Sequence, residues 1–247
     1  MQISYKKYIP SSTAVFTRRI LSILLLHLLF TISSCKKEND FVPAASLNVI
    51  NASPGISSAQ VQTPYATGYF NQLIEIGYGS NFVFNIPTGK VGIGISTSVD
   101  TTKPAYTTQL TTNGGDIYSY FIAGSAGEDI ISNKDVIPVI ADSSFGLRFI
   151  NCSYNSDPVN VTLSTSSGSN EFSAIAYKSL TGFKNYSARA ADPSTYTFEV
   201  WDGNGNQLAT LDVATPNYVK KNITLVFQGI IGASGSTSPG LFIVNNF

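Results

Sequence analysis

One stretch of sequence recurs at a spacing of one hundred residues, and this repeat limits the folds open to the chain. LNVINAS at residues 47–53 aligns without a gap on LRFINCS at residues 147–153. At the same spacing Val61 falls on Val161, and with a few inserted residues the segment 117–121 aligns on 223–227. A duplicated unit of this length predicts two copies of one domain.

Within each copy, apolar residues alternate with others over short runs that are separated by Gly, Asn, Asp, Ser and Pro. Val91 and Ile93 show this spacing in the first copy, and Phe198 and Val200 show it in the second. Such alternation predicts strands with one buried face. An apolar period of 3.6 is missing, so helices should be scarce. We therefore expect an all-β fold of two tandem immunoglobulin-like β-sandwich domains, at residues 46–142 and 143–247.

The alternation also predicts which side chains fill the two cores. Ten side chains should lie mostly buried on inner strand faces: Val49, Val61, Ile93, Ile95, Phe121, Phe149, Val161, Phe198, Val200 and Phe227. Ile50 should superimpose on Ile150. The short polar link at residues 142–144 predicts a limited interface between the domains, which would leave the loops as the surface for partners.

The first thirty-four residues have the pattern of a signal peptide, because a basic start precedes an apolar run at residues 20–32. This run is shorter than the roughly 20 residues that a membrane-spanning helix needs. ISS at residues 32–34 leads directly into Cys35, which resembles the lipobox of bacterial lipoproteins. We therefore expect residues 1–34 to be removed. Residues 35–45 should form a lipidated cysteine and a tether, with acyl chains such as palmitate on Cys35 anchoring the protein to a membrane.

A charged run, KKEND at residues 36–40, follows the lipobox. It resembles the lysine-then-acid export signal that sends lipoproteins of the Bacteroidota to the outer face of the outer membrane. The resemblance implies a lipid-anchored protein of the outer membrane, displayed at the cell surface, with the periplasmic face as the alternative. The simpler interpretation is a solvated tether.

Removal of the precursor segment leaves a mildly acidic chain. Four of the fifteen Lys and Arg lie in that segment, so eleven remain against fifteen acidic residues. The basic residues form no stripe, and we therefore expect no nucleic-acid partner. Cys152 has no cysteine left to pair with, and it stands where the first copy has Ala52. We expect a small buried thiol at this position.

Three segments carry a further resemblance: VINASPG at residues 49–55, QVQ at 60–62 and IPTGKVGI at 86–93. They resemble the hallmark segments of the domain-of-unknown-function family numbered 4397. The second copy departs from the pattern at residues 152–154, so its assignment rests on the internal repeat. The resemblance implies an extracytoplasmic protein, often a lipoprotein with the domain in tandem, and it supplies no catalytic residues.

The residues offer little catalytic chemistry. The only histidine, His27, leaves with the signal peptide, which excludes a Ser-His-Asp hydrolase and makes a zinc enzyme improbable. Gly89 and Lys90 lack the other residues of a phosphate loop and predict a turn into a strand. DGNGN at residues 202–206 begins like a calcium loop, but the later ligand positions fail, which favours a hairpin turn. We therefore expect no catalytic residue, no cofactor and no metal site.

Binding then remains as the function to be expected. Thr197, Glu199 and Trp201 should face away from the core of the second domain, where the indole can stack on a sugar or a partner side chain, or simply cover the edge of the core. We expect a non-catalytic membrane-anchored module for binding, adhesion or assembly, with a protein or glycan ligand. One alternative is a glycan-binding accessory lipoprotein. The other is a carboxylate-based hydrolase, for which Glu128 and Asp129 are the adjacent acids.

Overall fold

The computed structural model describes residues 43–63, 74–96, 104–166 and 168–246. Cys35, the signal segment 1–34 and most of the tether therefore lie outside the described residues. Strands dominate the described part, and its helical segments are three short 3-10 turns, η1 (Ser164–Ser166), η2 (Thr215–Asn217) and η3 (Gly235–Thr237). In these ranges no helix has the length and apolar character needed to span a membrane. The all-β prediction is confirmed.

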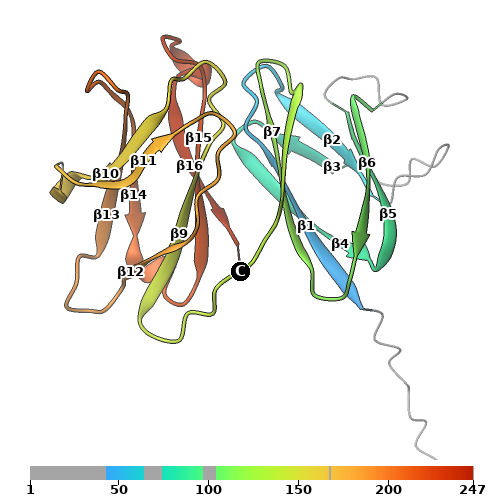
Figure 1. Cartoon of the computed structure of the whole chain (residues 1–247), viewed down its shortest axis with the longest axis horizontal. Coiled ribbons are helices and arrows are strands. Elements are labelled where there is room, and N and C mark those ends of the chain that lie inside the picture. The colour runs from blue at the N-terminus through green and yellow to red at the C-terminus, as the bar shows by residue number, and fades with distance from the viewer. Residues whose placement is uncertain (1–42, 64–73, 97–103, 167, 247) are drawn as a thin grey trace, which may run out of the picture. The chain divides into compact units, whose positions relative to one another are not determined.

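The first copy forms a sandwich of two four-stranded sheets, with strand orders β4-β1-β7-β8 and β3-β2-β5-β6 (Figure 1). Its strands are β1 (Ala44–Asn51), β2 (Ser58–Gln62), β3 (Ile74–Gly77), β4 (Ser80–Pro87), β5 (Gly89–Ser96), β6 (Tyr106–Thr112), β7 (Ile117–Ala123) and β8 (Asp129–Lys134). β1 and β7 run parallel, whereas β1 and β4 run antiparallel.

The second copy repeats this topology, with strand orders β12-β9-β15-β16 and β11-β10-β13-β14. Its strands are β9 (Ser144–Asn151), β10 (Val159–Leu163), β11 (Asn170–Ile175), β12 (Lys184–Ser187), β13 (Thr195–Trp201), β14 (Gln207–Ala214), β15 (Asn222–Gln228) and β16 (Gly240–Asn245). Val61 pairs with Ile95 in the first copy, and Val161 pairs with Val200 in the second. The predicted equivalence of Val61 and Val161 is therefore confirmed, and so is the prediction of two tandem sandwiches.

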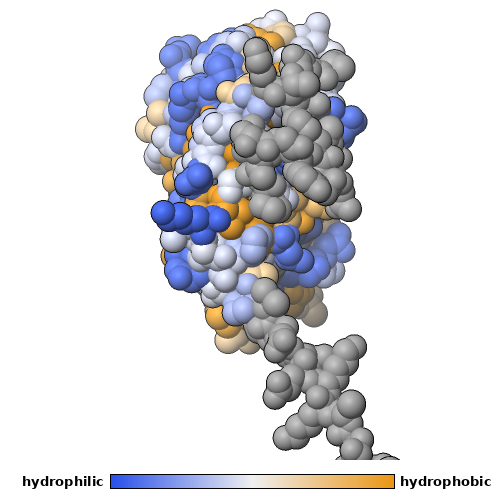
Figure 2. All heavy atoms as spheres, turned by 90° about the vertical axis from the view of Figure 1, so that its right-hand side faces the viewer, coloured by the Kyte–Doolittle hydropathy of each residue, from blue (hydrophilic) through white to orange (hydrophobic). Residues whose placement is uncertain are grey.

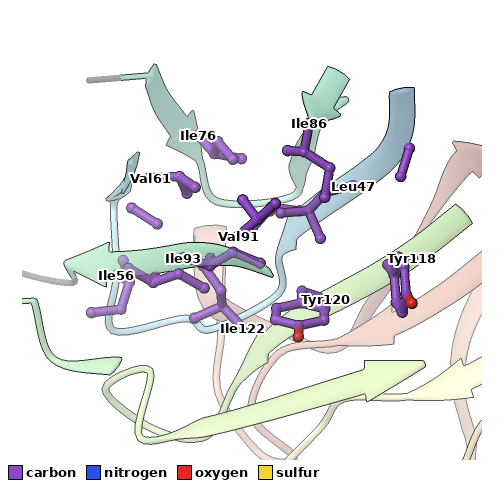
Figure 3. Close-up of a cluster of buried hydrophobic side chains, with 14 residues drawn as sticks. Leu47, Ile56, Val61, Ile76, Ile86, Val91, Ile93, Tyr118, Tyr120 and Ile122 are labelled. Atoms are coloured by element: carbon purple, nitrogen blue, oxygen red, sulfur yellow. The ribbon is translucent and has the colours of Figure 1, made fainter. Parts of the chain in front are cut away.

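Each sandwich encloses an apolar core between its two sheets. Figure 3 shows Leu47 from β1 beside Ile86 from β4 and Val91 from β5 in the first core. In the second core the ring of Phe149 stacks on those of Phe172 and Phe227, with centroids 6.2 and 6.5 Å away. All ten side chains predicted to be buried are buried. Each contributes roughly 1.5 to 3 kcal/mol to stability.

In the structure, the correspondence between β7 and β15 is shifted by one residue from the alignment that the two sequences suggest. The residues that follow β1 and β9 donate equivalent backbone hydrogen bonds to the carbonyls of Ile122 and Phe227. Ile122 is therefore the counterpart of Phe227, and Phe121 is the counterpart of Val226. A slip of one residue exchanges the two faces of a strand, so Phe121 points away from its own core and contacts the second sandwich. The expectation that Phe121 lines the inner face was wrong.

The Asn-x-Ser sequence shared by the copies fixes the chain after β1 and β9. In each copy the asparagine amide donates to a carbonyl of the third strand. The serine hydroxyl donates to the carbonyl of the glycine that follows the seventh strand. These bonds are Asn51 to Ile76 (3.0 Å), Ser53 to Gly124 (2.9 Å), Asn151 to Ile175 (3.1 Å) and Ser153 to Gly229 (2.9 Å). The best-matched part of the repeat thus satisfies buried polar groups.

The two sandwiches pack against each other through a third apolar cluster, which we term the seam. It joins sheet β4-β1-β7-β8 to sheet β12-β9-β15-β16, and its buried side chains are Ile50, Ala52, Phe121, Ala123, Ile150, Cys152, Val226 and Val244. Ile50 and Ile150 are counterparts in the repeat, as are Ala52 and Cys152. The copies therefore meet through equivalent faces. The limited interface expected from the short polar link is contradicted, because β1, β7, β9 and β15 are buried on both faces.

A buried ion pair crosses the seam. Arg148, on β9, and Asp135, which follows β8, have side chains that are 3% and 0% exposed. The guanidinium donates to both carboxylate oxygens of Asp135 at 2.8 and 3.0 Å, and its Nε donates to Thr224 Oγ1 at 2.8 Å. Ser119 Oγ and Asn133 Nδ2 donate to the same carboxylate at 2.6 and 2.5 Å. Both charges are thus compensated by several hydrogen bonds.

Candidate functional site

Glu128, one of the two adjacent acids, stabilises the loop in which it lies. Its carboxylate accepts hydrogen bonds from the backbone N–H groups of Ser125 (3.0 Å) and Ala126 (2.7 Å) and from Ser125 Oγ (2.9 Å). Its own backbone N–H and that of Ala126 lower the pKa of Glu128 to about 2. Gly124, at φ +87°, makes room for this side chain, because a Cβ there would lie 2.5 Å from Glu128 Cδ.

Asp129 takes different partners, which come from the second sandwich. Its carboxylate accepts a hydrogen bond from the Tyr177 hydroxyl at 2.8 Å and forms an ion pair with Lys178 Nζ at 2.6 Å. A carboxylate-based hydrolase needs one carboxyl group that stays protonated near neutral pH. The pKa of Glu128 is lowered instead, so its carboxyl group is ionised near neutral pH. The adjacent acids therefore lack the arrangement that would favour hydrolysis, and the described residues contain no cluster of His, Cys, Asp and Glu able to hold a metal ion.

Cys152, Gly89 and the segment 202–206 also have structural roles. Cys152 is fully buried in the seam, where burial raises the pKa of the thiol. Gly89, at φ +94°, begins β5 directly after the turn from β4. Asp202 closes the hairpin between β13 and β14, because its Oδ1 accepts the backbone N–H groups of Asn204 and Asn206, both at 2.8 Å. The predicted turn at Gly89 and hairpin at residues 202–206 are confirmed.

Trp201 lies at the end of β13, where alternation turns it away from the buried Phe198 and Val200. It shares the outer face of its sheet with side chains of β10, β13 and β14. We term this surface the Trp201 face, and its residues are Asn160, Thr162, Thr197, Glu199, Trp201, Thr210 and Asp212. The indole is half-buried, and its Nε1 donates to Thr162 Oγ1 at 3.0 Å. The sequence predicted the outward side chains of β13, but the neighbours from β10 and β14 follow only from the register.

A shallow cavity of about 350 Å³ opens beside the seam, and sequence reasoning did not find it. The cavity is lined by the end of β8, by Val136 and Pro138 in the link between β8 and β9, by Arg148, and by residues 180–183 of the β11–β12 loop. Two side chains of the link are highly exposed, Val136 at 84% and Val139 at 94%. The apolar sequence of residues 136–140 was the available signal.

The first sandwich also carries exposed apolar side chains. Phe82 and Val83 on β4 are 42% and 39% exposed, and the ring of Phe82 packs edge-on against Phe84 with centroids 4.8 Å apart. Figure 2 shows hydrophobic residues among hydrophilic ones on the side of this sandwich that faces away from the second. Exposed apolar residues are common on protein surfaces. The Trp201 face, with a fixed indole among polar groups, is therefore the candidate site.

The lowered pKa of Glu128 predicts a pH-dependent contribution to stability. The carboxylate stabilises the fold above its unfolded pKa of 4.5, and this contribution is lost as the pH falls towards about 2. Glu128→Gln should therefore be less stable than the native chain at pH 7, by on the order of 1 kcal/mol or less because the group is exposed. The difference should shrink below pH 4.5. Urea denaturation of both proteins at several pH values measures it.

Glu75→Gln serves as the matched control, since Glu75 is an exposed carboxylate whose side chain accepts from the Gln60 amide. This control should change stability less than Glu128→Gln at pH 7. A gain in stability of Glu128→Gln at pH 7 would indicate a raised pKa and would return the hydrolase to consideration.

The comparisons with known proteins give likenesses to solved structures only. Neither a protein-family model nor a curated protein sequence matches the chain. The TIE protein of Bacillus anthracis is 11% identical over 76% of this chain, with a TM-score of 0.26, and the chain spans 33% of its length. The α-glucan-recognising family 41 carbohydrate-binding modules of streptococcal virulence factors are 8% identical, with a TM-score of 0.25 and coverage of 80% and 96%. A proposed adhesin from Bacteroides ovatus is 8% identical, with a TM-score of 0.23 and coverage of 82% and 92%.

Proposed function

We propose that this protein is a lipid-anchored extracytoplasmic module that binds a partner without catalysis, in adhesion or assembly. Cys35 carries the anchor, and the tether from residue 36 connects it to the two sandwiches. The outer membrane is the site of attachment, and the cell surface is the side of display. The sequence features that support this part are the lipobox resemblance at residues 32–35 and the charged run at residues 36–40. Membership of the domain-of-unknown-function family numbered 4397 stays a prediction.

The seam is the observation that carries the binding role. It joins the sandwiches through equivalent faces, and the Arg148–Asp135 pair adds a bidentate contact. Glu128 and Asp129 are likewise engaged in contacts that stabilise loops and the seam. Because these charged side chains stabilise the protein itself, the surfaces that remain for a partner are the exposed sheet faces and the loops. Such preorganised surfaces bind with a smaller entropic cost than flexible ones.

A glycan-binding accessory lipoprotein is the second candidate function. The Trp201 face supports it, because a half-buried indole lies there beside a carboxylate and an amide. The carboxylate-based hydrolase is less favoured, since the pKa of Glu128 is lowered and Asp129 is paired with Lys178.

Substitution of the anchoring cysteine tests the lipid attachment. In cells fed labelled palmitate, Cys35→Ala should remove nearly all label from the protein, because a thioether-linked lipid needs the thiol. The variant should also leave the membrane fraction. Cys152→Ala is the matched control, since the first copy has alanine at the equivalent position, and it should keep the label. Equal labelling of Cys35→Ala and the native chain would contradict the anchor.

Protease added to intact cells tests the side of display. The native protein should be digested, because residues 36–40 resemble an export signal for surface lipoproteins. A variant with Glu38→Ala and Asp40→Ala should stay lipidated but become protected. Immunoblotting before and after the outer membrane is broken provides the measurement. Protection of the native chain until that membrane is broken would place it on the periplasmic side.

A further inference from the structure

We propose that the Trp201 face binds a neutral glycan, with the Trp201 indole stacking on a sugar ring and Glu199 and Asn160 bonding to its hydroxyl groups. This inference rests on the proposed binding function and names the site and the class of ligand. It concerns the second sandwich alone.

The indole is held in place before any ligand arrives. Trp201 lies directly opposite Asn160 on β10, yet its Nε1 donates to Thr162, two residues further along that strand. The ring therefore lies diagonally across the β10–β13 pair and covers the hydroxyl of Thr162, which is buried. Because the one polar atom of the ring is already bonded, its remaining exposed surface is apolar. A fixed aromatic surface of this kind suits the C–H face of a pyranose.

Two polar side chains beside the indole have unused bonding capacity. Asn160 accepts the backbone N–H of Ala174 at its Oδ1 (2.9 Å), which leaves its amide nitrogen as a donor. The Glu199 side chain is half-exposed, and among the described residues it has no hydrogen-bond or ion-pair partner. Asn160 lies directly opposite Trp201, and Glu199 lies two residues from Trp201 on the same strand. Such neighbours on one face of a sheet lie roughly 5 to 8 Å apart. A carboxylate acceptor and an amide donor at these distances from a ring match the vicinal hydroxyl groups of a sugar.

The charged residues of the sheet indicate which class of glycan the face can bind. The four strands β10, β11, β13 and β14 contain no Lys or Arg, whereas they carry Glu171, Glu199 and Asp212. Glu171 is paired with Lys184 of β12, whereas Glu199 and Asp212 have no Lys or Arg partner among the described residues. A uronic acid, a sulfated sugar or a phosphate on the Trp201 face would be repelled by these two carboxylates. A neutral sugar accepts such carboxylates as hydrogen-bond acceptors. The face therefore favours neutral glycans over anionic ones.

The first sandwich shows that the fold does not require the indole. Its counterparts follow from the register, because Gln60 pairs with Ser96 as Asn160 pairs with Trp201, and Gln62 pairs with Gly94 as Thr162 pairs with Glu199. Serine and glycine thus replace tryptophan and glutamate in the same backbone setting. Gln62 and Ser96 are buried, and no aromatic ring stands at either position of the first copy. Divergence of the repeat at these positions is what a binding role for the second copy predicts.

Trp201 is the single tryptophan of the chain, so its fluorescence reports directly on the proposed site. The Cys35→Ser chain would be titrated with neutral oligosaccharides, namely linear hexamers of α-1,4-glucose, β-1,4-glucose, β-1,3-glucose, xylose and mannose. Oligogalacturonate and hyaluronan oligomers would serve as anionic probes. We expect a saturable change in the emission with at least one neutral series and none with the anionic probes.

Variants separate binding at this face from binding elsewhere. Calorimetry with the best neutral probe should show affinity at least about tenfold weaker for Trp201→Ala, and weaker binding for Glu199→Gln. Gln109→Ala, on the exposed β6 of the first sandwich, is the control and should bind like the native chain. Thermal unfolding would confirm that each variant is folded, and Trp201→Phe, which keeps an aromatic ring, should retain part of the affinity if Trp201→Ala does not fold.

Several results would overturn the glycan assignment. They are a flat fluorescence titration with every neutral probe, equal binding of an anionic probe, or full affinity in folded Trp201→Ala and Glu199→Gln. The broader binding function has a separate readout, which is cross-linking of the anchored protein on intact cells. A partner captured there equally by the native chain and by Trp201→Ala would leave the binding module standing while removing the glycan site.

Discussion

The pairing of Arg148 with Asp135 is the contact on which the arrangement of the two sandwiches depends. Burying an unpaired guanidinium costs several kcal/mol, so the apolar faces at the seam can close only when Asp135 reaches Arg148. The carboxylate comes from the link between the domains, and Asn222 holds that link by donating to the Pro138 carbonyl at 2.8 Å. Removing one partner of such a pair costs about 3 to 5 kcal/mol. The ion pair thus ties β9 to the segment that follows β8, and the apolar cluster supplies the contact area at the seam.

Much of the fold could be predicted from the sequence, because the repeat and the alternation of apolar residues are local signals. They placed Val61 and Val161 in equivalent strands and turned Trp201 outward. They misplaced Phe121, since the strand that contains it is apolar on both faces and the spacing of two then no longer identifies the inner one. A strand buried on both sides indicates a second packing partner. The seam is that partner.

The ion pair and the neighbours of Trp201 depend on register and on long-range packing, which one sequence does not encode in a readable pattern. One signal was available: Arg148 replaces Asn48 of the first copy in the middle of an apolar strand, and a charge buried there needs a partner. Asp135 lies in a segment without periodicity, so its role could not be assigned. The substitutions that distinguish the copies, at Arg148 and Trp201, fall at the seam and on the candidate face.

The reactivity of the Cys152 thiol tests directly whether the two sandwiches stay closed on the seam. In the Cys35→Ser chain Cys152 is the single thiol, and it is fully buried in the seam. Labelling with a thiol reagent under native conditions gives the free energy of the opening that exposes it. A closed unit predicts that this value equals the global free energy of unfolding from urea denaturation. Labelling with an opening free energy several kcal/mol below the global value would show that the sandwiches separate while folded, which contradicts a single rigid unit.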